Sequence, residues 1–319
     1  TMLAAFERAG FTDLHSVKEQ QEPDPDFPTV PFPNPEEKGA IDLAAKLAEQ
    51  IEADLVIAND PDADRCAAAI YDPRREAWRM LHGDELGLLL ATYVATHRPV
   101  RGTFANSIVS SRSLGALANA RRYKSTQTLT GFKWIARAEN IAFGYEEAIG
   151  YCVLPEVVKD KDGMSAALAI AELAALTKAK GSSLTELLDE LAREIGLYLT
   201  SQLSIRVSNL DLIGEMMHTL RTTPPKTLAG SSVVEVRDLA EGTVETTGLP
   251  PTNGMLLLAA DDSRVIVRPS GTEPKLKAYL EVVTKVEENA DFNDLSAARE
   301  HATEKLEQMK KELSELLGS

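Results

Sequence analysis

The chain is short of cysteine and of positive charge, and it has no long uncharged apolar run. Its 319 residues include two cysteines, Cys66 and Cys152, whose wide spacing indicates neither a disulfide framework nor a cysteine metal site and fits a reducing, cytoplasmic compartment. Lysine and arginine total 34 against 49 acidic residues, a net charge of −15, which argues against a nucleic-acid or anionic-membrane surface. The longest uncharged apolar stretch, Leu86 to Thr96, is shorter than the roughly 20 residues of a membrane span, and no signal-peptide pattern is visible.

Several motifs of known chemistry are also absent. The sequence has no G-x-G-x-x-G fingerprint, no G-x-x-x-x-G-K-[ST] phosphate loop and no G-x-S-x-G nucleophile elbow. Its five histidines form no metal-ligand pattern. Any anionic ligand therefore has to be held by a local cluster of cations and backbone amides.

What is present indicates a globular protein of several domains. The composition is 44% hydrophobic and 26% charged, and the length suits two or three domains of about 100–200 residues each. Strands and helices alternate over the first two thirds, which predicts a parallel or mixed sheet, whereas from about Leu199 short β-like runs flanked by helices predict a separate α+β domain. The chain opens on TMLAAFERAG, which reads as a helix already in progress, so we expect an upstream part to be missing.

Periodicity predicts individual elements. A Pro-rich loop over 22–35 should lead into a helix capped by Asn34, with Pro35 at its first position and apolar residues recurring from Ile41 to Ile51. Further helices are expected at 114–121, 164–179, 183–193 and 295–317. Strands are expected at 54–58, 66–71, 103–109, 126–129, 141–145, 201–207, 233–236, 255–259, 265–267 and 278–283.

An acidic loop, ANDPDADRC at 58–66, follows the first of these strands. Asp60, Asp62 and Asp64 alternate and are followed by Arg65, at the strand end where open α/β sheets usually place ligands. An EF-hand loop needs Gly at its sixth and Glu at its twelfth position, where this sequence has Arg65 and Tyr71. Carboxylate oxygens select Mg²⁺ or Ca²⁺, and the planar guanidinium of Arg65 suits a phosphate. The pattern favours a metal site over a solvated turn.

Two cationic or polar turns lie downstream. RPSGTEPKLK, at 268–277, offers the amides and hydroxyls of a tight turn flanked by charge, as an anion nest does. TGFKW, at 130–134, is a glycine turn with Lys133 near a helix start, a position that favours anions. Ordinary turns with solvated charges remain the alternative for both.

Two further motifs carry charge at element ends. GYEEAIGY, at 144–151, places Glu146 and Glu147 after an apolar strand, where they could accept hydrogen bonds from sugar hydroxyls. KDKDG, at 159–163, places Lys161 before an Ala-rich helix, where it could meet an anion. A polar strand end and a solvated helix start are the alternatives.

The order DPDADR, TGFKW, GYEEAIGY with KDKDG, and RPSGTEPK resembles the α-D-phosphohexomutase family, and most closely its phosphoglucomutase/phosphomannomutase branch of the phosphoglucomutase-2 and phosphopentomutase type. The resemblance extends over nearly the whole chain. Family members have four domains around a cleft, and the first carries a phosphorylated serine in a motif like T-A-S-H-N-P, which this sequence lacks.

The resemblance implies a fold and a set of boundaries. We expect two α/β phosphohexomutase-type domains, the first incomplete, followed by a C-terminal α+β domain. Residues 1–79 would be the remainder of mutase domain 2 with the metal loop, residues 80–198 domain 3 with the sugar loop, and residues 199–319 domain 4 with the phosphate loop. A missing N-terminal domain of the same protein would then be the partner of this chain.

The resemblance also implies an isomerase. It would interconvert sugar 1-phosphate and sugar 6-phosphate through a phosphoserine and a sugar 1,6-bisphosphate, and this piece alone would be inactive. Asp60, Asp62 and Asp64 would hold Mg²⁺, Arg65 would contact the phosphoserine, and Lys161 would assist proton transfer. The sugar would be contacted by Thr130, Gly131, Lys133, Glu146 and Glu147. The phosphate that is not transferred would be bound by Arg268, Ser270, Gly271, Thr272 and Lys277.

Departures from the family pattern leave alternatives. Ala148 stands where many relatives have a serine whose hydroxyl meets the sugar, which leaves room for pentose phosphates. Pro61 and Ala63 replace glycines common elsewhere, although the carboxylates remain. A haloacid-dehalogenase-like phosphatase using Asp60 as nucleophile and a non-catalytic module binding metal or sugar phosphate are the rival functions.

Overall fold

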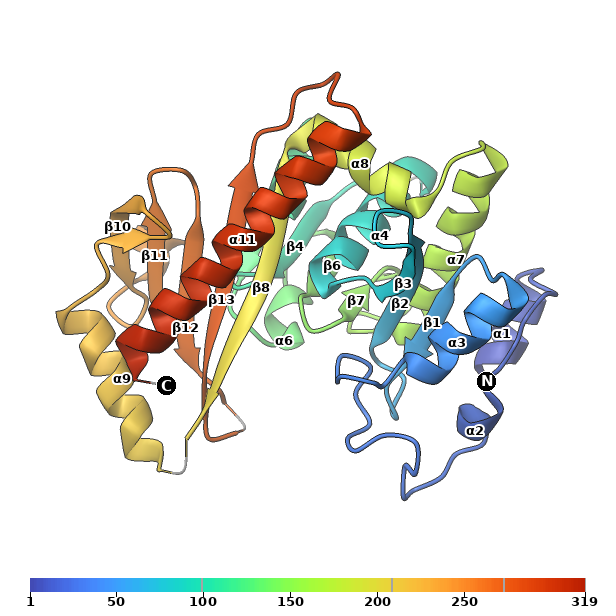
Figure 1. Cartoon of the computed structure of the whole chain (residues 1–319), viewed down its shortest axis with the longest axis horizontal. Coiled ribbons are helices and arrows are strands. Elements are labelled where there is room, and N and C mark those ends of the chain that lie inside the picture. Colours follow the sequence, from blue (N-terminus) through green and yellow to red (C-terminus); the bar gives the residue numbers. More distant parts are fainter. Residues whose placement is uncertain (99, 208, 272, 319) are drawn as a thin grey trace. The chain divides into compact units, whose positions relative to one another are not determined.

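The structure, a computed structural model, describes residues 1–98, 100–207, 209–271 and 273–318 (Figure 1). It divides into two compact units. Unit 1 comprises Thr1–Ser107 and Leu114–Glu190, and unit 2 comprises Ile108–Ser113 and Leu191–Ser319. The short segment 108–113 therefore packs with a part of the chain that begins only at Leu191.

A small antiparallel sheet carries the acidic loop in unit 1. Its strands β1, β2 and β3 lie in that order, at Val56–Asn59, Cys66–Asp72 and Ala77–Met80. Because Asn59 pairs with Cys66, the acidic loop is the connection of a hairpin, at the end of β1 where it was expected. The helices of this part are α1, α2 and α3, at Met2–Arg8, Lys18–Gln21 and Asp42–Ile51.

The helix predicted to begin at Asn34 begins later, at Asp42. Asn34 caps a local turn instead, since its side-chain oxygen accepts from the backbone N–H of Glu36 at 3.2 Å. Gly39 has φ +87, a left-handed conformation that ends this turn before helical backbone can continue. The prediction of a helix beginning at Asn34 was therefore wrong, because the residue caps a turn and the helix begins at Asp42.

The second sheet of unit 1 is mixed, as strand–helix alternation predicted. Strands β5, β4, β6 and β7 lie in that order, at Lys124–Thr128, Thr103–Ser107, Ile141–Glu146 and Gly150–Cys152. The first three are parallel, and β7 turns back antiparallel to β6. The accompanying helices are α4, α5, α6, α7 and α8, at Gly83–His97, Ser113–Ala120, Phe132–Ile135, Gly163–Ala179 and Leu184–Ile195.

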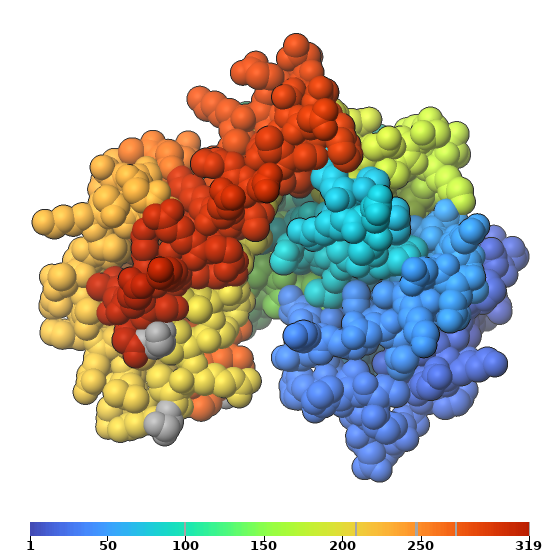
Figure 2. Space-filling model, in the orientation of Figure 1, coloured from blue at the N-terminus to red at the C-terminus, as the bar shows by residue number. Residues whose placement is uncertain are grey.

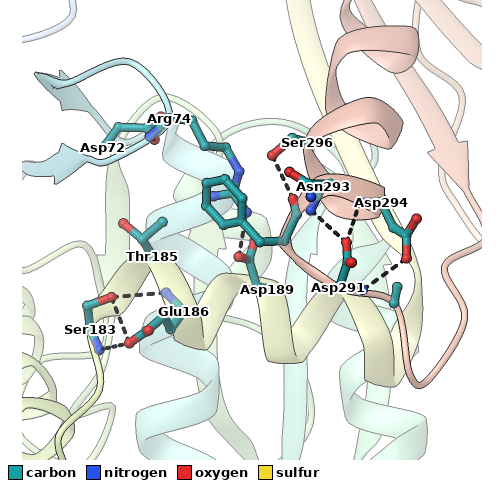
Figure 3. A network of polar contacts seen from close by, with 12 residues as sticks. Asp72, Arg74, Ser183, Thr185, Glu186, Asp189, Asp291, Asn293, Asp294 and Ser296 are labelled. Atoms are coloured by element: carbon teal, nitrogen blue, oxygen red, sulfur yellow. Dashed lines mark hydrogen bonds and ion pairs between the residues drawn. The ribbon is translucent and has the colours of Figure 1, made fainter.

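Burial explains why these segments form the core of unit 1. β4 and the middle of β6 are buried throughout, with Phe104, Phe143 and Tyr145 fully enclosed. A strand of a sheet covered on both faces usually has apolar residues without alternation, as the first five residues of β6 do. In β4 the buried residues Thr103, Asn106 and Ser107 are polar. Helix α8 is tied to the end of β2 by the ion pair of Arg74 with Asp189, 2.6 Å (Figure 3).

Unit 2 is built on one antiparallel sheet. The order is β8, β13, β12, β11, β10, β9, at Leu197–Arg206, Lys275–Thr284, Arg264–Pro269, Met255–Ala259, Ser231–Asp238 and Thr227–Leu228. The helices are α9, α10 and α11, at Leu210–Thr222, Val244–Thr247 and Phe292–Leu317. The α+β domain expected here is therefore present.

Helices α9 and α11 cover one face of this sheet. Val265 and Val267 of β12 join Leu306 and Met309 of α11 in the core. The outer side of α11 is exposed along its length and forms the red band of Figure 2. Its start is fixed by Asp291, whose carboxylate accepts from the backbone N–H groups of Asn293 and Asp294 (Figure 3).

The opposite face of the sheet carries a ladder of charged pairs. Arg264 and Glu281 pair across β12 and β13, and Arg268 pairs with Lys277 further along the same two strands. Arg264 donates to the carbonyls of Ile108 and Ser110, at 3.0 and 2.8 Å. Segment 108–113 therefore lies beside the pair of Arg264 and Glu281. The predicted phosphate loop lies at the other end of the two strands, beside Arg268 and Lys277.

Candidate functional site

Three carboxylates converge in the acidic loop. One oxygen from each of Asp60, Asp62 and Asp64 lies within 4.8 Å of the others. Asp60 is buried, Asp64 is partly buried and Asp62 is exposed. Asp60 accepts from the backbone N–H of Arg65 at 3.0 Å and from its Nε at 2.5 Å. The loop thus has one fixed carboxylate and two that are more open to solvent, and carboxylate oxygens at this spacing suit a hard cation.

The charges of this loop influence one another. Burial opposes ionisation of Asp60, but hydrogen bonds from the side chain and backbone of Arg65 outweigh it and lower the pKa of Asp60. A hydrogen bond with Asp60 and repulsion from Asp60 and Asp64 raise the pKa of Asp62. A cation among the three oxygens would relieve this repulsion.

Lys161 reaches the same loop from the start of α7. Its Nζ lies 3.0 Å from Oδ2 of Asp64 and 5.6 Å from the ring centre of Phe132. The stem of Lys161 passes Gly150 so closely that an added Cβ there would lie 2.4 Å from Cδ. Burial lowers the pKa of Lys161, but the hydrogen bond and charge of Asp64 outweigh it and raise the pKa, so the amine is held as a cation.

The two glutamates of GYEEAIGY point to different partners. Glu146, at the end of β6, accepts from the backbone N–H of Gly131 at 2.7 Å, which joins the GYEEAIGY motif to the TGFKW motif. Burial raises the pKa of Glu146, an effect partly offset by Gly131 and by the charge of Lys161. Glu147 instead accepts from the hydroxyl of Ser107, at 3.0 Å.

The remaining unit 1 residues lie around this contact. Thr130 is partly buried just before Gly131, and Lys133 is exposed on α6 with its Nζ 5.9 Å from the ring centre of Trp134. Motifs that are far apart in sequence therefore meet in unit 1, because Asp64 contacts Lys161 and Gly131 contacts Glu146.

The predicted phosphate loop lies in unit 2, between β12 and β13. Arg268 and Lys277 are cross-strand partners and both are partly buried. The backbone N–H of Ser270 donates to the carbonyl of Lys275 at 2.8 Å, and Gly271 is exposed with open space where a side chain would stand. Thr272, the fifth residue predicted for this site, lies outside the described residues. The turn presents two cations beside exposed backbone, an arrangement suited to an anion.

Sequence reasoning missed the residues that support these loops. Asn59 donates from Nδ2 to the carbonyl of Arg65 at 2.7 Å and closes the acidic loop. Because Asn59 lies inside the ANDPDADR stretch, its position in the sequence could have indicated a role in this loop. Ser107, which holds Glu147, carries no such signal because it lies 40 positions away on a neighbouring strand.

Three family models match the chain in order. They are described as "Phosphoglucomutase/phosphomannomutase, alpha/beta/alpha domain II" over residues 1–72, "alpha/beta/alpha domain III" over residues 82–195 and "C-terminal domain" over residues 229–298. Together they account for most of the sequence. In the part of the chain that the structure describes, no helix is long and apolar enough to span a membrane.

Curated relatives give similar results. A probable phosphomannomutase of Haemophilus influenzae is 44% identical over 285 residues, covering 89% of this chain and 57% of that protein. The phosphopentomutase of Homo sapiens is 34% identical over 350 residues, covering 99% of this chain and 54% of that protein. The phosphoribomutase of Saccharomyces cerevisiae is 35% identical, covering 88% and 51%. The chain spans about half the length of the curated relatives it matches.

Among solved structures, the fold is similar to that of parafusin from Paramecium, which is described as a phosphoglucomutase. The TM-score is 0.63 at 20% identity, covering 90% of this chain and 51% of that one. A protein from Thermus thermophilus described as a "putative phosphomannomutase" has a TM-score of 0.57 at 21% identity, covering 86% of this chain and 51% of that one. These likenesses concern the fold.

Proposed function

Because the chain belongs to the phosphoglucomutase/phosphomannomutase family, we propose that it supplies the metal-, sugar- and phosphate-binding parts of a reversible sugar-phosphate mutase. The enzyme would interconvert sugar 1-phosphate and sugar 6-phosphate through a sugar 1,6-bisphosphate. The observation that carries the proposal is the meeting of the acidic loop, Lys161, Glu146 and Gly131 in unit 1. The phosphoserine would come from a segment outside this chain.

The donor set suits Mg²⁺. Asp60, Asp62 and Asp64 bring hard oxygens together without a soft ligand among them, and Mg²⁺ is usually bound by a few carboxylates plus phosphate. When bound, the ion would stabilise the charge that spreads over the transferring phosphoryl group.

Side chains of unit 1 would orient the phosphate and the sugar and would transfer the proton. Arg65, held against Asp60, would orient the phosphate of the phosphoserine through its planar guanidinium. Lys161 would hold a proton at Nζ and exchange it with the sugar hydroxyl that attacks or leaves. Glu146 would accept from sugar hydroxyls beside Gly131, with Thr130, Lys133 and Glu147 completing the sugar site.

The loop in unit 2 would bind the phosphate that is not transferred. Arg268 and Lys277 would supply charge, while Ser270 and Gly271 would supply hydroxyl and backbone donors. Thr272 joins this set from the sequence alone. Such a site would bind a phosphate group whichever way the sugar is oriented. This suits a bisphosphate that must bind in either direction.

A coupled assay tests the proposal. The protein containing this chain together with its serine-bearing domain would be assayed on glucose 1-phosphate with glucose 1,6-bisphosphate as activator. We expect turnover that needs Mg²⁺, that falls by several orders of magnitude in Asp62→Asn, and that is absent from the 319-residue chain alone. Turnover by the chain alone would refute the claim that the serine lies elsewhere.

The same assay separates the rival functions. A phosphatase that uses Asp60 would release inorganic phosphate with no bisphosphate requirement, although Asp60 is already bound to Arg65 here. A non-catalytic module would bind sugar phosphate in calorimetry and turn nothing over.

A second substrate class is favoured by one observation. Ala148 is exposed in the loop between Glu147 and Ile149 and offers no hydroxyl. A site lacking this donor loses less when the sugar lacks the matching hydroxyl. We propose ribose 1-phosphate and deoxyribose 1-phosphate as alternative substrates, to be compared with glucose 1-phosphate by kcat/KM. An Ala148→Ser variant should shift that ratio towards glucose.

A further inference from the structure

The acidic loop and the loop between β6 and β7, residues 146–150 of GYEEAIGY and hereafter the sugar loop, share an unusual backbone feature. Ala63 in the first and Ile149 in the second have left-handed backbones, with φ +57 and +54. A Cβ makes this conformation costly, and for a β-branched residue such as Ile149 it is an outlier. Conformations of this kind persist only where the surroundings hold them, and they cluster at functional sites. Something in unit 1 must therefore hold each loop.

The acidic loop is held by the first residue of α7. The backbone N–H of Gly163 donates to the carbonyl of Ala63 at 3.2 Å. A Cβ added at Gly163 would lie 2.3 Å from the carbonyl oxygen of Arg65, 2.6 Å from that of Ala63 and 2.6 Å from Nδ2 of Asn59. Two of these three atoms are backbone, which cannot swing aside as a flexible side chain can. Any side chain at position 163 would push the helix and the loop apart.

The first residue of α4 packs just as closely on the sugar loop. A Cβ added at Gly83 would lie 1.8 Å from the carbonyl oxygen of Glu147 and 3.2 Å from the backbone nitrogen of Ile149. The carbonyl of Gly83 also accepts from the hydroxyl of Tyr151, at 3.0 Å, just beyond the loop. In both cases the first residue of the helix is a glycine, and its lack of a side chain lets the helix pack directly on the loop backbone.

We propose that Gly163 and Gly83 are positioning residues, one for the acidic loop and one for the sugar loop. Each lets a helix start lie directly on loop backbone and so keeps a strained residue in place. The inference rests on the proposed function for the meaning of the two loops, but the backbone contacts stand without it. Moving the peptide of Arg65 would move Asp60, because the backbone N–H of Arg65 donates to that carboxylate. Gly163 therefore sets the spacing of the three carboxylates.

The two glycines differ from a glycine on an open helix surface. Gly115 in α5 would bring an added Cβ no closer than 3.8 Å to the nearest side-chain atom, which is ordinary contact. Gly115→Ala is therefore a matched control: the same substitution, in a helix, in the same unit.

Hydrogen exchange of the chain, read by mass spectrometry without metal, tests the positioning. Gly163→Ala should raise exchange at least tenfold in peptides spanning 59–66. It should raise exchange less in 146–150, which is joined to the acidic loop by the bond from the backbone N–H of Cys66 to the carbonyl of Ile149. Gly83→Ala should do the reverse, and Gly115→Ala should change neither. Unchanged exchange in the matching loop of either glycine variant would overturn the proposal, as would equal changes in both loops.

Calorimetry with Mn²⁺ adds a functional measurement. Gly163→Ala should weaken binding at least tenfold, and Gly115→Ala should not. Because this chain alone is titrated, the result does not depend on turnover. If wild type binds no Mn²⁺, the metal part of the proposed function fails while hydrogen exchange still decides the role of the glycines. If Gly163→Ala destabilises the whole chain, exchange in peptides spanning 59–66 should still rise more than in peptides of β4; an equal rise in both would count against the proposal.

Discussion

Glu146 and Glu147 are neighbours in sequence, yet their carboxylates have different partners. Glu146 accepts from a backbone N–H of the TGFKW motif, whereas Glu147 accepts from the hydroxyl of Ser107. Adjacent residues at a strand end point to opposite sides, so one can face the site while the other is turned back towards the sheet. Equal roles for the two, as the motif alone indicates, are therefore not required by the structure.

This difference predicts unequal effects on catalysis. In the proposed complete mutase, Glu146→Gln should lower kcat/KM by about 10- to 100-fold, because a charge-assisted hydrogen bond contributes roughly 1.5–3 kcal/mol. Glu147→Gln should lower kcat/KM less and lower the melting temperature more. Steady-state kinetics and thermal unfolding of both variants check this, and a larger kinetic loss for Glu147→Gln would contradict it.

Ala63 allows a second test at the scale of one residue. Its left-handed backbone costs roughly 1–2 kcal/mol in an L-residue. Glycine removes that cost but raises the conformational entropy of the unfolded chain, which offsets part of the gain. Ala63→Gly should therefore leave the free energy of unfolding unchanged or raise it by up to about 1 kcal/mol, whereas Ala63→Val should lower it by more than about 1 kcal/mol. Urea unfolding of the two variants distinguishes these outcomes.

Among elements, the join of β3 to α4 depends on ions. Arg79 of β3 lies 2.7 Å from Glu85 in the first turn of α4 and 3.1 Å from Asp72 at the end of β2. Burial opposes ionisation of Glu85, but the charge and hydrogen bonds of Arg79 outweigh it and lower the pKa of Glu85 to about 2. The start of α4, on which the sugar loop rests, is thus held by a charged pair.

This pair makes stability depend on pH in the acid range. Since the pKa of Glu85 is lower in the folded than in the unfolded chain, its contribution is complete above about pH 5 and is lost as pH falls towards 2. The loss amounts to at most about 3 kcal/mol. Urea unfolding at pH 7 and pH 3 should show a smaller difference between the two pH values for Glu85→Gln than for wild type. An identical difference would remove the pair as the cause.

In unit 2 the corresponding element contact is the buried pair of Arg264 and Glu281, which are 4% and 1% exposed. Glu281 also accepts from Arg112 and Ser111, so Glu281→Gln would leave two guanidinium groups poorly compensated. We expect a loss of about 3–5 kcal/mol in the free energy of unfolding, as for other broken buried pairs. The exposed pair of Glu307 with Lys310 provides the control, and Glu307→Gln should cost less than about 1 kcal/mol in the same urea titration.

The strands could be predicted from sequence because buried strands have uninterrupted apolar runs. β1, β2 and β11 were expected within a few residues of where they lie. Helix α4 was not identified, because it is buried on several sides and its apolar residues form no single stripe. The start of α3 was misplaced because a turn and a helix share the same capping residues.

The candidate site could likewise be predicted from sequence only where its residues are contiguous. Residues contiguous in a loop, such as the three aspartates, could be identified from their spacing. Contacts between elements, such as Gly163 with Ala63, depend on how helices dock and leave no local pattern in the sequence.

For the molecule as a whole, the two compact units separate the proposed metal and sugar residues from the proposed phosphate loop. We therefore predict that the ligand-free chain binds metal and phosphate independently. Arg268→Ala should weaken binding of glucose 1-phosphate at least tenfold in calorimetry and leave Mn²⁺ affinity within twofold of wild type. A parallel loss of Mn²⁺ affinity would show that the two sites are coupled.

Segment 108–113 bears on how such a chain can be divided or recombined. The chain passes between the units three times, at 107–108, 113–114 and 190–191. A single cut near residue 190 would leave Arg112 without Glu281 and leave Arg264 without the carbonyls of Ile108 and Ser110. In chimaeras with relatives, the six-residue insert and the C-terminal part would have to be inherited together, as one discontinuous module. Gene fragments exchanged at linear domain boundaries should therefore give insoluble products unless residues 108–113 travel with 191–318.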